Sequence, residues 1–133
     1  MSNAQNLAYA VIQVAHNFGA ATAIGSSFAG VLISNGGIRR ALLRVLLAGW
    51  SIQTVSGIAF GATSFYFYGR PPDIGGTALL ALYVKIACVV GGFAVVGFAF
   101  TTDPGKSADW IWPLSAALTA TALTAAAFLR WFS

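Results

Sequence analysis

The sequence predicts an all-α membrane protein, a four-helix transmembrane bundle that forms a single integral-membrane domain over residues 1–133. Hydrophobic residues make up 58% of the chain and charged residues only 8%, whereas a soluble domain carries roughly a quarter charged residues to face water. The apolar residues also gather in four stretches, at about 7–33, 43–68, 76–101 and 110–131. Each stretch exceeds the ~20 residues that a helix needs to cross the hydrocarbon core of a bilayer.

Each stretch is expected to be helical, because a lone strand would leave backbone groups without hydrogen-bond partners in lipid. Polar segments at 34–40, 69–76 and 103–109 separate the stretches. The first reads as a turn followed by charge, and the second holds two prolines and three glycines. Because these connections are short, neighbouring helices should run antiparallel and pack as a bundle.

Small residues recur at helical spacing on three of the stretches. They are Gly19, Ala23, Ser26 and Gly30 on the first, Gly49, Gln53, Gly57 and Gly61 on the second, and Ser115, Thr119, Ala122 and Ala126 on the fourth. Small residues let helix backbones approach closely where lipid supplies no hydrophobic drive for association. The stripes predict helix packing within the bundle, and an interface in a homo-oligomer or with a partner subunit is the alternative.

The distribution of Lys and Arg predicts an orientation. The first and third connections share one side of the membrane and hold more basic residues, which are Arg39, Arg40, Arg44 and Lys106 against Arg70 and Arg130. Cytoplasmic loops are enriched in Lys and Arg, so both termini are expected on the non-cytoplasmic side.

The first apolar run is too long for the hydrophobic core of a signal peptide. We therefore expect it to be retained as a membrane span, in a bacterial inner membrane.

Composition and missing motifs exclude several function classes. The net charge of +4 arises because the sequence holds only three acidic residues, not from a cluster of Lys and Arg, so nucleic acid is not an expected partner. No Asp or Glu lies within a predicted span, which removes the intramembrane carboxylate of proton-coupled drug exporters. The sequence also lacks a P-loop, a zinc-protease motif and a serine triad. We therefore expect no catalytic activity from this chain alone.

Polar residues inside the first span form a candidate ligand-binding face. Gln13, His16 and Asn17 lie at positions i, i+3 and i+4, so they share one side of a helix. His16 is the only histidine, and an ionisable residue inside a membrane is a functional candidate by default. It is a candidate metal or haem ligand or a proton-handling group; the alternative is a neutral imidazole that bonds to a neighbouring helix.

Lys85 is the second candidate, inside the third span. It either extends to the interface near Arg70 and Asp73 or faces an internal polar site. Because the first and third spans enter from the same side, His16 and Lys85 both lie about nine residues, or ~14 Å, below that entry. If their helices face each other, the pair offers hydrogen-bond donors and no carboxylate. Such a site suits an anionic or electron-rich ligand, such as a haem propionate or a quinone carbonyl.

Two segments carry a family resemblance. Residues 16–25 (HNFGAATAIG) place a histidine before small residues and a glycine, and residues 44–85 run from an arginine through Val55-Ser56-Gly57 to Leu82-Tyr83-Val84-Lys85. Over roughly residues 8–100 the chain resembles the copper-resistance protein D (CopD)-like membrane family. The resemblance implies a four-helix core linked to copper handling or b-type haem, with His16 and Lys85 at the family's histidine and lysine.

The chain departs from that family's pattern at its metal ligands. The tryptophan expected a few residues after the histidine is missing, no second histidine is present, and Met1 is the only methionine. A bis-histidine haem site or a His/Met copper site would therefore need a ligand from another chain. Haem b and copper are the candidate cofactors, and neither is required.

Three functions follow from these residues. The leading hypothesis is a helix-packing subunit, either of a homo-oligomer or of a larger membrane complex such as an electron-transfer complex. The second is a CopD-like copper or b-haem protein that uses His16. The third is a small transporter or channel, whose polar path would run through Gln13, His16, Asn17, Gln53 and Lys85.

Overall fold

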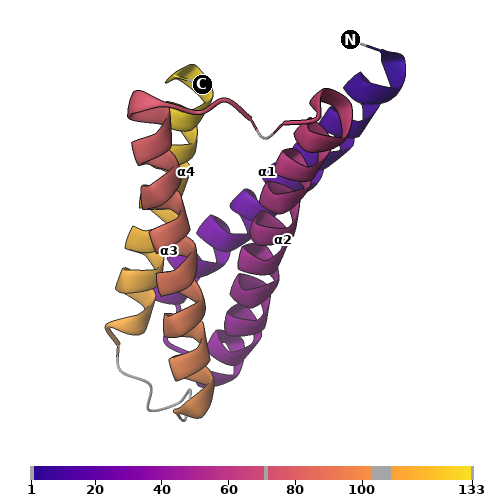
Figure 1. Ribbon diagram of the computed structural model, residues 1–133. Helices are drawn as coiled ribbons and strands as arrows, with labels where there is room; N and C mark the ends of the chain where they lie inside the picture. The colour runs from indigo at the N-terminus through magenta and orange to yellow at the C-terminus, as the bar shows by residue number, and fades with distance from the viewer. Residues whose placement is uncertain (1, 71, 103–108, 133) are drawn as a thin grey trace.

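The computed structural model describes residues 2–70, 72–102 and 109–132, and it confirms the predicted fold class (Figure 1). The helices are α1 (Asn3–Leu32), α2 (Gly36–Tyr68), α3 (Gly76–Thr101) and α4 (Ile111–Phe132). All four are long and apolar enough to cross a membrane. The chain is therefore a multi-pass membrane protein by helix length and hydropathy, and its termini lie toward the same end of the bundle (Figure 1).

Side-chain caps make the first two helices longer than their apolar stretches. Ser2 accepts a hydrogen bond from the backbone N–H of Gln5, and α1 begins before its apolar run. The Asn35 side chain accepts from the backbone N–H of Ile38 in the same way. Because this cap starts α2 at Gly36, Arg39 and Arg40, which the sequence places in the first connection, lie inside the helix. Of the predicted connection at 103–109, residues 103–108, Lys106 among them, lie outside the described residues.

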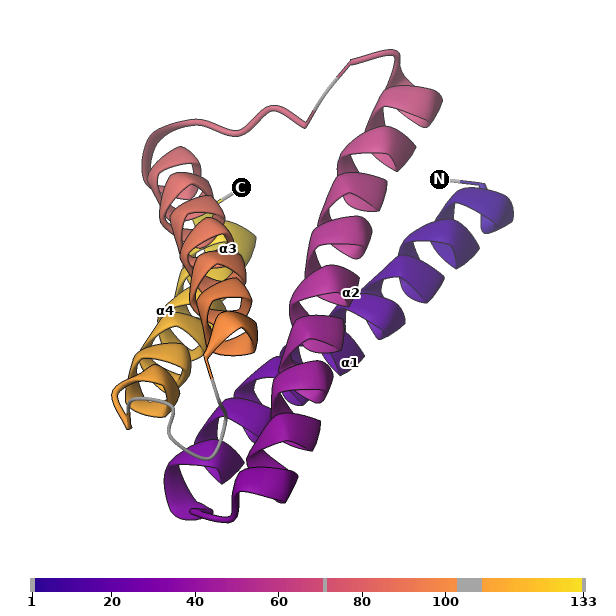
Figure 2. The ribbon, with the colours of Figure 1, turned by 90° about the horizontal axis from the view of Figure 1, so that it is seen from below.

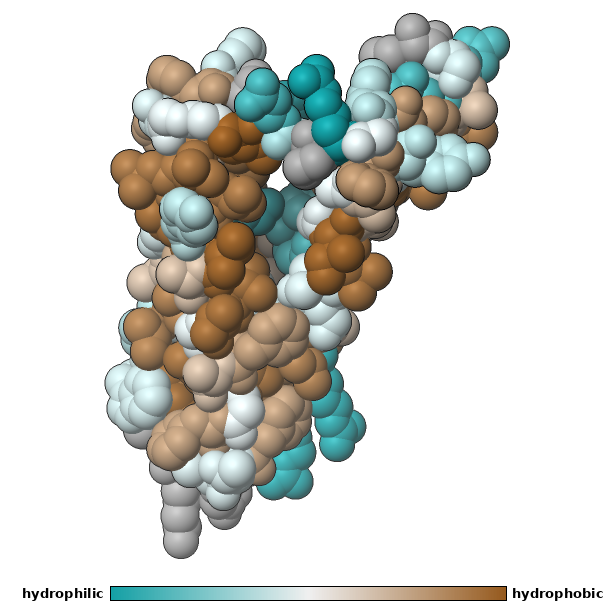
Figure 3. Space-filling model, in the orientation of Figure 1, coloured by the Kyte–Doolittle hydropathy of each residue, from teal (hydrophilic) through white to brown (hydrophobic). Residues whose placement is uncertain are grey.

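The helices form two antiparallel pairs, α1 with α2 and α3 with α4, and most helix contacts lie within the pairs. The pairs meet near the connection between α1 and α2 and diverge toward the end that holds the termini (Figures 1 and 2). The space-filling view shows the molecule hollowed between them, with hydrophilic side chains inside (Figure 3). This hollow lies between the part of α2 that follows Trp50 and the part of α3 that precedes Gly92.

Two tryptophans join the pairs, Trp112 near the closed end of the bundle and Trp50 further along α2. Trp50 of α2 lies against Gly92 of α3, where an added Cβ would come within 2.5 Å of the indole. Trp112 of α4 lies against Gly30 of α1, where an added Cβ would come within 1.9 Å. Both indoles are buried. Glycine is therefore required at both positions because a ring occupies the space of a side chain.

The small-residue stripe of α1 packs within the bundle, as predicted. Its four residues are buried, and a Cβ at Gly49 of α2 would come within 2.7 Å of the Ala23 backbone nitrogen. Gly57 and Gly61 differ, since a Cβ at either would meet nothing within 4 Å. The described chain thus shows no close packing contact at these two glycines. They lie seven and eleven residues after Trp50, on the same helix face, where α2 has already diverged from α3.

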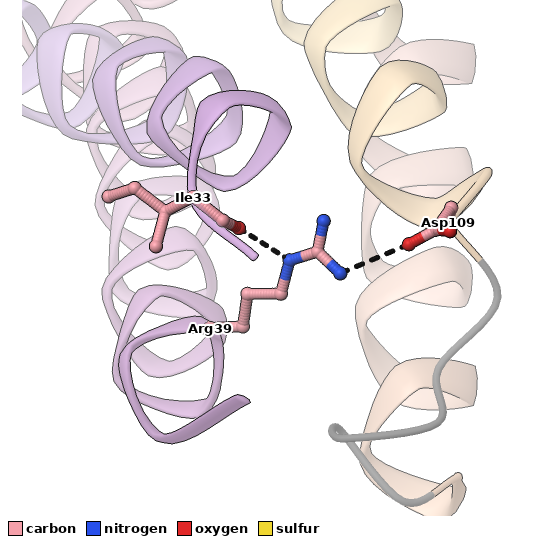
Figure 4. Close-up of polar contacts among 3 residues, drawn as sticks. All are labelled: Ile33, Arg39 and Asp109. Atoms are coloured by element: carbon pink, nitrogen blue, oxygen red, sulfur yellow. Dashed lines mark hydrogen bonds and ion pairs between the residues drawn. The ribbon is translucent and has the colours of Figure 1, made fainter. Parts of the chain in front are cut away.

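Arg39 links the elements at the closed end (Figure 4). Its Nε donates to the carbonyl oxygen of Ile33 at 2.7 Å, and its Nη1 lies 3.1 Å from Asp109 Oδ1. The guanidinium also stands 5.9 Å from the centre of the Trp112 ring. One side chain thus ties the end of α1 and the start of α2 to the segment that leads into α4.

Candidate functional site

Lys85 and His16 meet at the hollow. The Nζ of Lys85 on α3 lies 2.8 Å from Nε2 of His16 on α1, and both side chains are half-buried. The equal depths that the sequence predicts for these residues are consistent with this contact. The alternative expectation, an extension of Lys85 to the interface near Arg70 and Asp73, is wrong because the amine bonds to the imidazole instead.

Close contacts of α3 with α2 and of α1 with α2 bring Lys85 and His16 together. Lys85 lies seven residues before Gly92, so it shares the α3 face that touches Trp50. His16 lies one turn before Gly19, where a Cβ would come within 2.8 Å of the Ile52 side chain. The imidazole is therefore held against α2, and Lys85 reaches it from α3.

Ser56 fixes the tautomer of His16. Its Oγ lies 2.7 Å from His16 Nδ1 and 2.6 Å from the carbonyl oxygen of Ile52. A serine hydroxyl has one proton and a carbonyl only accepts, so Ser56 donates to Ile52 and accepts from Nδ1–H. The Nε2 of His16 then carries the lone pair and accepts from Lys85. The bonds run in one direction, from Lys85 through His16 and Ser56 to the α2 backbone.

Two further residues of α2 hold the histidine. The Nε2 of Gln53 donates to the backbone carbonyl oxygen of His16, and the Gln53 side chain is buried. The ring of Phe60 meets the imidazole edge to face, with centroids 5.7 Å apart. Neither Ser56 nor Phe60 is among the site residues expected from the sequence. The available signal was the position of Ser56, one turn after Gln53 on the same helix.

Lys85, His16, Ser56 and Gln53 form one polar cluster. Gln13 and Asn17 do not join this cluster. Their side chains bond to each other at 2.7 Å on the exposed surface of α1. In the described structure no hydrogen bond joins them to Lys85 or Ser56. They remain candidate ligand-binding residues, but they do not extend the cluster into the polar path that a transporter or channel would need.

The cluster offers positive charge and no negative charge. A lysine ammonium has three donors, and the described structure pairs Lys85 Nζ only with His16 Nε2. The ion pair between Arg39 and Asp109 lies at the closed end and not at this cluster. Among the described residues, no group of three or more His, Cys, Asp or Glu side chains could hold a metal ion. The arrangement suits an anionic or electron-rich group better than a cation.

Comparisons with known proteins leave the family open. No family model matches the sequence, and no curated protein or solved structure matches it either. The resemblance to the CopD-like family stays a prediction that depends on the segments around His16 and Lys85.

Proposed function

We propose that this chain is a membrane subunit without catalytic activity, which packs through its hollow against a transmembrane helix of another subunit. Gly57 and Gly61 carry the proposal. Glycine inside a helix costs about 1 kcal/mol relative to alanine, and Gly30, Gly49 and Gly92 offset this cost through close contacts. Gly57 and Gly61 make no such contact within the described chain. They form a GxxxG pair facing the hollow, the arrangement that brings transmembrane helices close together.

The hydrogen bonds of the polar cluster support a role without catalysis. Both nitrogens of His16 are engaged, and the hydroxyl of Ser56 is bonded to the backbone. A general base needs a free lone pair within reach of a substrate proton. In this arrangement the cluster positions Lys85 and does not expose a base.

A copper or b-haem site at His16 is the second candidate, favoured by the position of this residue at the hollow. Such a site needs the Nε2 lone pair, which accepts from Lys85 in this structure. It also needs a second ligand from another chain. An absorption spectrum from 350 to 700 nm and metal analysis of the purified protein test it, with His16→Ala as the matched variant.

We also propose a bacterial inner membrane as the location, with both termini on the non-cytoplasmic side. The Lys and Arg count supports this assignment. Arg39, Arg40 and Arg44 all lie near the start of α2, at the end of the bundle opposite the termini.

The subunit proposal is tested by the mass of the particle extracted from native membranes in mild detergent. We expect the unaltered protein and Gly97→Ile to remain in a particle larger than 13.8 kDa, whereas Gly57→Ile and Gly61→Ile release the free chain. Gly97 is the matched control, because a Cβ there also meets nothing within 4 Å. A free 13.8 kDa chain in every case, or equal behaviour of all four proteins, would contradict the proposal.

A further inference from the structure

We propose that the helix entering the hollow belongs to a different protein and carries an aspartate or glutamate that pairs with Lys85. This inference rests on the proposed function and specifies the chemistry of the partner. It depends on the charge of Lys85, on the positions of the acidic residues in this chain, and on the open space beside Gly57.

The Lys85 ammonium has no negative partner in the described structure. Its Nζ bonds to His16 Nε2, a neutral acceptor. A charged lysine inside a membrane is costly, and such residues pair with opposite charges or with other polar groups. Lys85 is half-buried at the hollow, and its amine is bonded to α1 through His16. A carboxylate in the hollow would accept the two donors that His16 leaves unused.

A second copy of this chain could not supply that carboxylate from its helices. The three acidic residues of the sequence are Asp73, Asp103 and Asp109, and the residue ranges of the four described helices include none of them. Asp109 already pairs with Arg39. Because the described helices of this chain hold no carboxylate, the proposed partner helix has a different sequence.

The depth of Lys85 favours a helix over a lipid headgroup. Lys85 lies nine residues after the start of α3 at Gly76, or ~14 Å along the helix. Half of a ~30 Å hydrocarbon core is about the same distance. A phospholipid phosphate stays at the interface, whereas a carboxylate on a transmembrane helix can lie at any depth.

The hollow has open space at this depth. Gly57 lies seven residues after Trp50 and Lys85 lies seven residues before Gly92. Because Trp50 and Gly92 touch, both residues are ~10 Å from that contact along antiparallel helices. A Cβ at Gly57 would meet nothing within 4 Å. A helix on the Gly57–Gly61 face would thus present side chains directly to Lys85.

The test uses the full chain in phosphatidylcholine vesicles and fluorescence energy transfer to synthetic transmembrane peptides. The peptides are leucine- and alanine-rich and identical except for one central residue, Asp or Asn. We expect the Asp peptide to bind about tenfold more tightly than the Asn peptide, since charge-assisted bonds are about twice as strong as neutral ones. Lys85→Met should abolish this preference, Lys85→Arg should keep it, and Arg130→Met is the matched charge control.

The possible outcomes separate this inference from the proposed function. Equal binding of both peptides, weakened by Gly57→Ile but not by Gly97→Ile, would overturn the carboxylate partner and leave helix packing in place. Binding of neither peptide would overturn the inference. A third outcome is that phosphatidylglycerol is enriched around the chain only when Lys85 is present, while the Asp and Asn peptides bind equally. That result would also overturn the inference and would assign the site to a lipid.

Discussion

The indole of Trp112 on α4 occupies the space that a side chain at Gly30 on α1 would need. An added Cβ at Gly30 would come within 1.9 Å of the ring, although the two residues are 82 positions apart in the sequence. This contact and the matching contact of Trp50 with Gly92 hold the two helix pairs together in one half of the bundle. Toward the end of the bundle that holds the termini, no tryptophan of the described helices meets a glycine in this way, and the hollow lies there.

Gly30→Ala should destabilise the fold by about 1–3 kcal/mol, the cost of overpacking a close contact. Unfolding by sodium dodecyl sulfate in mixed micelles, followed by circular dichroism, measures the change. Gly25→Ala is the control, because a Cβ there meets nothing within 4 Å and alanine favours the helix. Equal stability of the two variants would mean that Trp112 moves aside freely.

Arg39→Ala should cost more stability than Asp109→Asn. The Arg39 side chain is 12% exposed and Asp109 is 92% exposed, so the ion pair itself is worth at most ~1 kcal/mol. Arg39 also bonds to the carbonyl oxygen of Ile33 and stands over Trp112. We expect a loss of about 1–2 kcal/mol for Arg39→Ala, measured by the same unfolding assay. A larger loss for Asp109→Asn would show that the ion pair dominates.

His16 should be the Nδ1–H tautomer, because Ser56 can only accept from it. The protein has one histidine, so ¹⁵N nuclear magnetic resonance of labelled imidazole reports this ring alone. Ser56→Ala removes the acceptor and should populate the Nε2–H tautomer, while Thr54→Ala on the same helix should leave the spectrum unchanged. An Nε2–H ring in the unaltered protein would contradict the hydrogen-bond assignment.

The start of α1 and the connection after it should lie on opposite sides of the membrane, with the start of α1 outside. In a Cys88→Ala background, Asn3→Cys should react with an impermeant maleimide added to intact cells. Ser34→Cys should react only after the cells are opened. Both residues are exposed, so access to them depends on the membrane. The reverse pattern would show that the Lys and Arg count gives the wrong orientation.

The four helices could be predicted from the sequence because hydrocarbon allows few alternatives. An apolar run longer than ~20 residues must hydrogen-bond internally in lipid, and only a helix does so within one segment. The equal depths of His16 and Lys85 follow from the same rule, since depth depends only on rise per residue and direction of entry. The caps at Ser2 and Asn35 were missed because short polar residues occur in turns as often as at helix starts.

The detail of the candidate site depended on which helix faces meet. Ser56 and Phe60 could not be placed beside His16 from sequence, because their contact depends on the close approach of α1 to α2 at Gly19. Gly57 and Gly61 carry the same pattern as the packed stripes, yet they face open space.

The sequence by itself determined that this chain has four membrane-spanning helices, one intramembrane histidine and one intramembrane lysine without a carboxylate. Only the tertiary structure decided that the helices form two diverging pairs and that Lys85 bonds to His16. The physical reason is that lipid contacts select helices by length and hydropathy alone. The angle between two helix pairs depends instead on where a large ring meets a glycine, and here Trp50 and Trp112 place both contacts in the same half of the bundle.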